Sequence, residues 1–400
     1  MNDFSGVSLR SLFLKHVAQT SPFPPALEVL HAEGIYITDI HGRKFIDFIS
    51  GISVCNVGHR HPKVVAAIKE QVDKYLHVMV YGEFVQGPQV KLAQKIASIL
   101  PKPLESVYFV NSGAEACEGA LKLVKRVTGR TEICCFENSY HGSTHGALSV
   151  MGNETFKQAY RPLLPDIRIL QFNDYNLLEQ ITKKTAGVIL ETFQGEAGLR
   201  IPDFEWLRAI RKRCTEVGAL LILDEIQTGF GRTGACFAFR HIGIIPDIVL
   251  MAKGMGGGIP IGAFVASNEH MSTFTNNPIL GHITTFGGNA LACAASLATL
   301  ETILDEGLIE SVPAKEKLIK ELLVNPKIKE IKGKGLLLAA CFDSNEIALK
   351  VMNACYTRGL ITDWFLFCDN ALRIAPPLTI THREIVEACT IMLEAINSLE

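Results

Sequence analysis

The sequence predicts an α/β fold with a mostly parallel sheet that has helices on both faces. Between about residues 107 and 263, short apolar runs rich in β-branched residues alternate with amphipathic stretches. This alternation is typical of strands joined by crossover helices, and continuous apolar runs indicate strands buried on both faces. The predicted strands are 107–110, 133–136, 167–170, 187–191, 219–223 and 248–252.

Three segments are expected along the chain. Residues 34–48 alternate apolar and polar side chains around a turn, which predicts a hairpin, and a helical pattern follows at 64–76. After a helix-like stretch at 290–306, the elements become shorter and mixed. We therefore predict an N-terminal segment (1–55) that packs with the small domain, a large domain (56–298), and a small α+β domain (299–400).

Composition narrows the class of protein. The 400 residues are 48% hydrophobic, and 39 basic against 41 acidic side chains leave a net charge of −2. This near-neutral balance gives no electrostatic reason to expect nucleic acid or an anionic membrane as partner. The apolar runs are strand-sized, and Met1-Asn2-Asp3-Phe4 lacks the basic start of a targeting segment. We expect a cytoplasmic protein whose 11 cysteines are buried, with neither a disulfide framework nor a metal site.

A carboxylate and an amine are predicted at the ends of two strands. The run 219–223 leads into Asp224, and the run 248–252 ends on Lys253, which is followed by a glycine-rich stretch. The carboxyl ends of parallel strands form the usual ligand edge of such a sheet. Pyridoxal phosphate (PLP) requires an amine that forms imines and a carboxylate that keeps a ring nitrogen cationic. The alternative is that Lys253 is a solvated loop lysine and Asp224 a turn residue.

A phosphate-binding turn is predicted at residues 112–115. Ser112, Gly113, Ala114 and Glu115 lie between the strand at 107–110 and a helical stretch at 116–127. Unpaired amides and the positive end of a helix face an anion in such a turn. Ser112 and Glu115 also fit a capping box, which could be their whole role; the two roles are compatible, because the amides of Gly113 and Ala114 stay available even if the side chains cap the helix.

Seven short blocks carry a family resemblance. They are NSGAEA (111–116), YHG (140–142), QGEAG (194–198), DEIQTGFGRTG (224–234), AKG (252–254), TTFGGN (284–289) and LRIAPP (372–377). In order and spacing they resemble the class III aminotransferases, most closely the acetylornithine and ornithine branch, from about Gly34 to the C-terminus. The resemblance implies the fold of PLP-dependent transferases of fold type I, with a seven-stranded type of sheet in the large domain.

The resemblance also implies roles for individual residues. Lys253 and Asp224 would be catalytic: the lysine binds PLP and carries the substrate proton, and the aspartate pairs with the pyridine nitrogen. Tyr140 and Ile226 would pack on the two faces of the ring, and Gln227 would lie near its phenolic oxygen. The implied cofactor-binding set is Ser112, Gly113, Ala114, Tyr140, His141, Asp224, Ile226, Gln227, Lys253 and Thr285.

Substrate and partner expectations follow from the same resemblance. Thr285 would reach the phosphate of the neighbouring subunit, which implies a homodimer with composite sites. Glu196 and Arg373 resemble a switch, in which they pair for one substrate and Arg373 is released for a dicarboxylate acceptor. The alternative is a purely structural salt bridge between these two side chains.

Two departures from the family pattern concern the amino donor. Ser143 stands where acetylornithine and ornithine enzymes carry an arginine that binds a substrate carboxylate, and serine cannot make that bidentate contact. Residues 191–193 (Glu-Thr-Phe) also replace a Glu-Pro sequence. We expect transfer of a terminal amino group from a small molecule such as acetylornithine, ornithine or 4-aminobutyrate to 2-oxoglutarate or pyruvate. The alternatives are an aminomutase of the glutamate-1-semialdehyde type and a non-catalytic PLP-binding protein.

Two further motifs are given no function. Residues 229–234 match G-x-G-x-x-G, but the sequence after them has no helical period, so we do not expect a dinucleotide site. His141 and His145 have a spacing that binds metals on helices, but Gly142 lies between them and no carboxylate is near.

Overall fold

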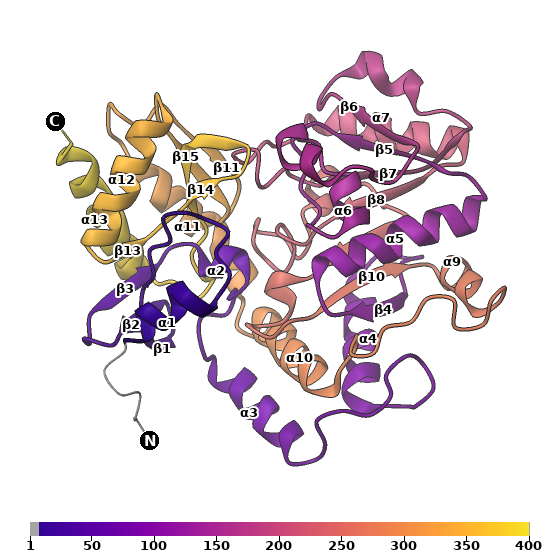
Figure 1. Ribbon diagram of the computed structural model, residues 1–400, viewed down its shortest axis with the longest axis horizontal. Helices are drawn as coiled ribbons and strands as arrows, with labels where there is room; N and C mark the ends of the chain where they lie inside the picture. Colours follow the sequence, from indigo (N-terminus) through magenta and orange to yellow (C-terminus); the bar gives the residue numbers. More distant parts are fainter. Residues whose placement is uncertain (1–7, 400) are drawn as a thin grey trace.

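The computed structural model describes residues 8–399 and contains a seven-stranded sheet in the order β4-β10-β9-β8-β7-β5-β6 (Figure 1). Neighbouring strands from β9 to β6 pair in parallel, while β10 is antiparallel to both β9 and β4. The predicted α/β class with a mostly parallel sheet is confirmed. The strands are β4 (Ser106–Val110), β5 (Glu132–Phe136), β6 (Ile167–Leu170), β7 (Thr185–Glu191), β8 (Leu220–Asp224), β9 (Ile248–Met251) and β10 (Gly262–Ala266).

The central strands are buried on both faces, as their continuous apolar sequence predicts. Along β8, Leu221 and Leu223 belong to one apolar cluster and Ile222 to the other, since successive side chains point to opposite faces. All three are fully buried, and burying such a side chain stabilises the fold by about 1.5–3 kcal/mol. This packing fixes the register of β8 and therefore the position of the residue at its end.

Helices cover the two faces of the large sheet. Helix α5 (Gly113–Thr128) contributes Ala120 to the cluster that contains Ile222, and α7 (Phe204–Val217) contributes Trp206 to the opposite one. Helix α5 begins after Ser112 and ends at Gly129, whose φ of 67° suits glycine. The predicted helix at 116–127 is therefore three residues longer at its N-terminus, which places residues 113–115 inside the first turn.

The other helical elements before residue 306 include α1, which lies beside strands β1 (Val29–Glu33) and β2 (Tyr36–Asp39) (Figure 1), and helices and turns that flank the large sheet or connect its strands. The predicted helix at 64–76 is present as α3, which begins two residues earlier, at Pro62, and ends four residues earlier, at Val72. The elements are α1 (Leu9–His16), α2 (Ser50–Ser53), α3 (Pro62–Val72), α4 (Gly87–Ile99), α6 (His145–Ser149), α8 (Phe239–Ile242), α9 (Asn268–Ser272) and α10 (Ala290–Asp305), with 3-10 turns η1 (Glu154–Phe156), η2 (Gln158–Tyr160), η3 (Tyr175–Gln180), η4 (Lys253–Met255) and η5 (Thr273–Thr275).

Two smaller sheets lie apart from the large one, on the side where both described chain ends are found (Figure 1). One has the order β1-β2-β3-β13 and the other β11-β12-β15-β14. Their elements are β1 (Val29–Glu33), β2 (Tyr36–Asp39), β3 (Lys44–Asp47), β11 (Glu330–Gly333), β12 (Leu338–Cys341), β13 (Leu360–Ile361), β14 (Trp364–Phe365) and β15 (Cys368–Ile374), with α11 (Leu308–Leu322), α12 (Asn345–Thr357) and α13 (His382–Asn397).

The first small sheet joins the two ends of the chain. Strands β2 and β3 form the predicted hairpin, and β3 pairs in parallel with β13, so N-terminal and C-terminal segments share one sheet. The domain boundaries after residues 55 and 298 remain predictions; the second falls within α10. Residues 1–7 of the N-terminal segment, which include Met1 to Phe4, lie outside the described residues.

The structure bears on the sequence expectations for the glycine motif, the cysteines, membrane-spanning helices and metal sites. Residues 229–234 form turns, and the next helix, α8, is only four residues long, so no helix opens after the glycine motif. All eleven cysteines are free and none is exposed. Over residues 8–399, no helix is long and apolar enough to span a membrane, and no group of three or more His, Cys, Asp or Glu side chains is arranged to hold a metal ion.

Candidate active site

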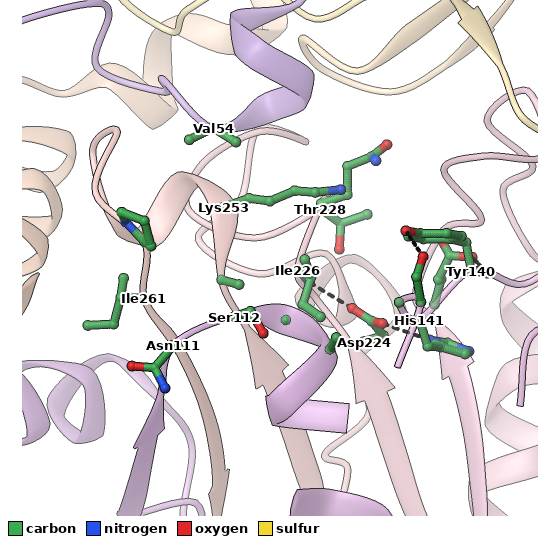
Figure 2. A pocket seen from close by; sticks show the side chains of 18 of the residues that line it. Val54, Asn111, Ser112, Tyr140, His141, Asp224, Ile226, Thr228, Lys253 and Ile261 are labelled. Carbon is green, nitrogen blue, oxygen red and sulfur yellow. Dashed lines mark hydrogen bonds and ion pairs between the residues drawn. The ribbon is translucent and has the colours of Figure 1, made fainter. Parts of the chain in front are cut away.

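A cavity of about 470 Å³ lies where β8 and β9 end and α5 begins (Figure 2). Its wall contains most of the residues that the sequence pointed to, from four separate stretches of chain. These are Ser112, Gly113, Ala114, Tyr140, His141, Ser143, Asp224, Ile226, Gln227 and Lys253. The carboxyl edge of the sheet therefore brings together groups that lie up to about 140 residues apart, as expected for a parallel sheet.

Asp224 is buried at the end of β8 and is held by two hydrogen bonds. His141 Nδ1 donates to Asp224 Oδ2 over 2.7 Å, and the amide of Ile226 donates to Oδ1 over 2.9 Å (Figure 2). Since an ionised carboxylate only accepts hydrogen bonds, the imidazole proton is on Nδ1. The other imidazole nitrogen is buried and has no hydrogen-bond partner among residues 8–399. His141 thus orients a carboxylate that faces the cavity.

Lys253 follows β9 and extends into the cavity (Figure 2). Its backbone has a φ of 44°, a strained conformation for a residue with a side chain, which costs on the order of 1 kcal/mol. Within the described chain, its amine makes no hydrogen bond or salt bridge. Burial lowers the pKa of Lys253, and the charge of Glu196 only partly opposes this effect. A lower pKa increases the fraction of neutral amine, which is the nucleophilic form.

The first turn of α5 presents open amides to the cavity. The hydroxyl of Ser112 accepts from the amide of Glu115 at 3.2 Å and caps the helix. The Glu115 carboxylate, however, accepts from the backbone and side-chain nitrogens of Asn111, at 2.7 and 2.9 Å. Ser112 therefore caps the helix as predicted, but the reciprocal half of the capping box is absent, because the box requires the Glu115 carboxylate to bind the amide of Ser112 itself. The amides of Gly113 and Ala114 remain available to an anion.

Two glycines allow this turn to pack closely against the strand ends. A Cβ at Gly113 would lie 2.7 Å from Cδ1 of Ile226. Gly142 has a φ of 128°, and a Cβ there would lie 2.6 Å from Cβ of Ala114. A side chain at Gly113 would require Ile226 to move, and one at Gly142 would press on Ala114, whose amide faces the cavity.

Glu191 is a buried carboxylate in the cavity wall that was not assigned a role from sequence. It ends β7 and pairs in register with Asp224 on β8. Its two oxygens accept from the amides of Tyr140 (2.9 Å) and Gly195 (2.7 Å). Burial, with the charge of Asp224 adding to it, raises the pKa of Glu191 to about 8. The sequence places Glu191 at the end of an apolar run, but its position beside Asp224 depends on the register between β7 and β8, which the sequence does not show.

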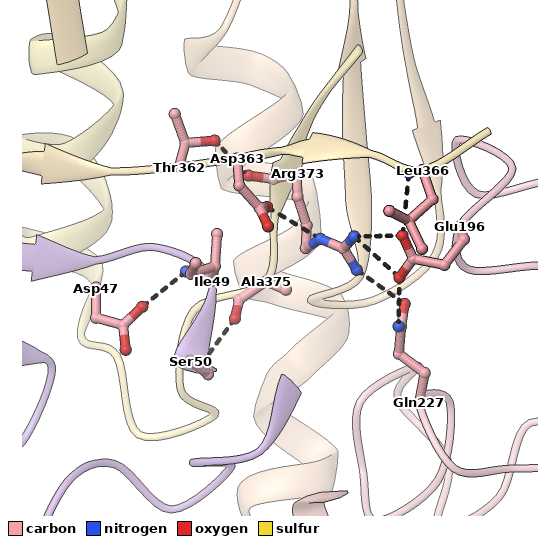
Figure 3. Close-up of polar contacts among 10 residues, drawn as sticks. All are labelled: Asp47, Ile49, Ser50, Glu196, Gln227, Thr362, Asp363, Leu366, Arg373 and Ala375. Carbon is pink, nitrogen blue, oxygen red and sulfur yellow. Dashed lines mark hydrogen bonds and ion pairs between the residues drawn. The ribbon is translucent and has the colours of Figure 1, made fainter. Parts of the chain in front are cut away.

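Arg373, Glu196, Gln227 and Asp363 form a polar group that we call the Arg373 cluster (Figure 3). Arg373 Nη2 donates to both oxygens of Glu196 at 3.0 and 2.9 Å, and Nη1 donates to Gln227 Oε1 at 3.2 Å. Burial would raise the pKa of Glu196, but the charges of Arg373 and Lys253 outweigh it and hold that pKa below its usual value. Glu196 and Arg373 do not line the cavity; Gln227 does, and connects the cluster to it.

Two predicted residues have different surroundings. Ser143 is exposed at the edge of the cavity, and its hydroxyl lies 3.2 Å from that of Tyr140. Thr285 is exposed and does not line the cavity of its own chain. The adjacent Thr284 accepts from the side chain of Asn111 at 3.1 Å, so the segment around Thr285 passes close to the start of α5.

Comparison with known proteins agrees with this site. The model of the family "Aminotransferase class-III" matches residues 17–396. An acetylornithine aminotransferase of Methanopyrus kandleri is 39% identical over 388 residues, which cover 96% of this chain and 97% of that protein. The acetylornithine aminotransferase of Bacillus subtilis is also 39% identical, over 92% of this chain and 95% of its own. The chain therefore belongs to the class III aminotransferases.

Solved structures support the same assignment. The ornithine aminotransferase of Toxoplasma gondii ME49 superposes with a TM-score of 0.91 at 27% identity, covering 98% of this chain and 96% of that chain. Another structure of the T. gondii enzyme has partial occupancy of PLP at its active site; it gives a TM-score of 0.90 at 28% identity, over 97% of this chain and 93% of that one. The protein is thus an aminotransferase similar to the acetylornithine and ornithine enzymes.

Proposed function

We propose that this aminotransferase uses PLP bound in the cavity to move a terminal amino group from a small donor to 2-oxoglutarate or pyruvate. The observation that carries the proposal is that one cavity combines a free lysine amine, a buried carboxylate and a helix N-terminus with open amides. These groups fit the aldehyde, the pyridine nitrogen and the phosphate of PLP respectively. When bound, PLP supplies an electron sink for the carbon that loses its proton.

Different residues of the chain have different roles in the proposed reaction. Lys253 binds the cofactor and, once displaced by a substrate amine, moves a proton at the reacting carbon, which its lowered pKa favours. Asp224, oriented by His141, keeps the pyridine nitrogen protonated through a charge-assisted hydrogen bond. Tyr140 and Ile226 hold the ring plane, and Gln227 lies at its phenolic edge. Ser112, Gly113 and Ala114 bind the phosphate.

We assign to the Arg373 cluster the part of the substrate that extends beyond the cavity, because Gln227 both lines the cavity and bonds to Arg373. With Glu196 paired to Arg373, the cluster accepts a neutral or cationic end; with Glu196 moved aside, Arg373 is exposed to a carboxylate. This supports use of one site by two dissimilar substrates in turn. Because Ser143 offers no guanidinium, the α-carboxylate anchor of acetylornithine enzymes is missing at that position. Acetylornithine, ornithine and 4-aminobutyrate are therefore candidate donors of unequal quality.

A donor screen without any acceptor tests the proposed function. Each amine is mixed with the PLP-loaded protein, and conversion of the cofactor from its aldehyde to its amine form is followed by absorbance. We expect ω-amino compounds to convert it as donors, and glutamate or alanine to convert it by the reverse of the acceptor half-reaction, whereas other α-amino acids without a second amine should react slowly. If no amine converts the cofactor, the proposed function is wrong. Strict need for an added keto acid in steady state separates aminotransferase from aminomutase activity.

We further propose that the working unit is a homodimer in which Thr285 binds the phosphate in the partner's cavity. The exposed position of Thr285, outside the cavity of its own chain, supports this assignment. Mixing inactive Lys253→Ala with a Thr285→Ala variant impaired in PLP binding should produce hybrid dimers with one intact site. Activity should appear on subunit exchange. Verified hybrid dimers without recovered activity would place each site within one chain.

A further inference from the structure

The cavity wall offers no cation for a donor carboxylate once PLP is bound. Within residues 8–399, Lys253 is the only lysine or arginine that lines the cavity, and the proposed function uses its amine for the aldehyde of PLP. Arg373 lies outside the wall and is already bonded to two carboxylates. A carboxylate carried into the cavity by the amino donor would therefore lose its hydration without gaining a partner of opposite charge.

Two hydroxyl groups form a polar pair at the edge of the cavity. Tyr140 Oη lies 3.2 Å from Ser143 Oγ, and both residues belong to the turn before α6 (Figure 2). One hydroxyl donates to the other, which leaves a single O–H free but several lone pairs. Such an acceptor-rich pair suits an ammonium group, which donates hydrogen bonds and cannot accept them. A carboxylate, which only accepts, finds no more than the single free O–H.

The ionisable groups bonded to this turn are acids. Directly after Ser143, the hydroxyl of Thr144 donates to the Glu118 carboxylate of α5 at 2.6 Å. On the other side of the turn, the amide of Tyr140 donates to the carboxyl group of Glu191 at 2.9 Å. Neither acid can offset the charge of a substrate carboxylate, and the charge of Glu118 attracts a cation and repels an anion. The surroundings of the hydroxyl pair therefore favour an ammonium group.

We propose that the amino donor is a short aliphatic diamine, whose transferred amine lies at Lys253 and whose second, ammonium end is bound by the hydroxyls of Tyr140 and Ser143. The inference rests on the proposed function and narrows its donor class. Overall, the donor carbon exchanges its nitrogen and one hydrogen for the carbonyl oxygen of the keto acid. The products are an amino aldehyde and an amino acid, so no further oxidant or reductant is needed. Donors such as ornithine carry a carboxylate that has no partner in the cavity.

A series of five-carbon amines that differ only at the far end tests this assignment. The far ends are ammonium (1,5-diaminopentane), hydroxyl (5-amino-1-pentanol), methyl (pentylamine) and carboxylate (5-aminopentanoate). Binding to PLP-loaded Lys253→Ala is followed by the absorbance of the cofactor, so affinity is measured without turnover. We expect the diamine to bind at least about tenfold more tightly than 5-aminopentanoate, with the alcohol and pentylamine between them.

Variants of the hydroxyl pair locate the effect. Ser143→Ala and Tyr140→Phe, each combined with Lys253→Ala, remove one hydroxyl, so the diamine should bind about tenfold more weakly. Pentylamine, which has no group to bond to a hydroxyl, should be affected less. Ser98→Ala, at an exposed serine of α4 outside the cavity, is the matched control and should behave as the parent. Ser143→Arg should reverse the order and favour 5-aminopentanoate.

The wild type supplies a measurement that depends on no variant. Without an acceptor, and at equal amine concentrations, conversion of the cofactor should be fastest with the diamine and slowest with 5-aminopentanoate. The proposal is overturned if 5-aminopentanoate equals or exceeds the diamine, or if diamine affinity is unchanged in both hydroxyl variants. A preference for the carboxylate among amines that do convert the cofactor defeats only the diamine assignment. Conversion by no amine at all defeats the proposed function as well.

Discussion

The cavity and the Arg373 cluster are neighbours linked by Gln227, but they are built differently. Most of the groups in the cavity wall come from the ends of strands in one sheet and the turns that follow them, with a lysine amine left free. The cluster takes Glu196 from the loop after β7 of the large sheet, Arg373 from β15 of a small sheet and Asp363 from the residue before β14, and each charge is in a salt bridge. The cavity therefore holds the groups needed for covalent chemistry, whereas the cluster can discriminate between substrates that extend beyond the cavity.

This difference separates reaction type from substrate choice. Burying the Lys253 amine without a partner costs free energy. Such an amine is therefore expected where a ligand binds it. A paired buried arginine, in contrast, binds a new anion only if an existing partner moves or loses its charge. Changes in the cavity should therefore affect both half-reactions, and changes in the cluster should affect one.

The largest effect is expected from Lys253→Ala. Removing the amine abolishes both cofactor attachment and proton transfer, so activity should fall on the order of 10⁴-fold or more. The phosphate turn and Asp224 are unchanged, so PLP should still bind without a covalent bond. Borohydride reduction of the wild type followed by peptide mapping should find the pyridoxyl group on Lys253. A label on any other lysine contradicts the assignment.

Asp224→Asn should reduce activity with every donor and acceptor alike. An amide cannot keep the pyridine nitrogen protonated, so we expect a loss of about 10²- to 10³-fold in both half-reactions. Single-turnover kinetics of each half-reaction measure this. His141→Asn should give a smaller loss of the same kind, because it removes only the orientation of the carboxylate. A selective effect on one substrate would remove the distinction between the cavity and the cluster.

Arg373→Ala should affect the half-reactions unequally. 2-Oxoglutarate carries a second carboxylate that pyruvate lacks, and it would lose the cation proposed to bind that group, so kcat/KM for 2-oxoglutarate should fall more than that for pyruvate, by about tenfold or more. Leaving Glu196 and Asp363 without their cation should also destabilise the fold, by up to about 3–5 kcal/mol. Thermal unfolding measures this part. Arg373→Lys, which keeps the charge but loses the planar contacts, serves as control, and an equal loss with both acceptors contradicts the prediction.

Ser143→Arg should have the smallest and most selective effect. The new guanidinium supplies the missing anchor for an α-carboxylate, so kcat/KM for N-acetylornithine should rise by about 1–3 kcal/mol in free energy. Ser143→Lys, with the same charge and a different shape, should improve it less. Efficient wild-type turnover of N-acetylornithine that is lost in Ser143→Arg would mean that another arginine already binds this carboxylate.

Much of the cavity could be predicted from the sequence for a physical reason. Apolar strands fully buried in a parallel sheet must end at one edge, so Asp224 and Lys253 had to approach each other. The turn at 112–114 was visible because small residues between a strand and a helix leave open amides. The hydrogen-bond partner of the Glu115 carboxylate was not predictable, because the amides of Asn111 and Ser112 lie at almost equal distance from Glu115 along the chain. Glu191 required knowledge of the register between β7 and β8.

The sequence by itself determined the fold class, the family and the groups at the ends of the strands, because these follow from local patterns and contiguous motifs. Only the tertiary structure decided that Asp363 shares Arg373 with Glu196. Asp363 carries no motif, and its contact with Arg373 depends on the turn between β14 and β15 and on how a small sheet meets the loop after β7. Charge pairing between separate elements is set by their packing, and one sequence pattern along the chain does not encode it.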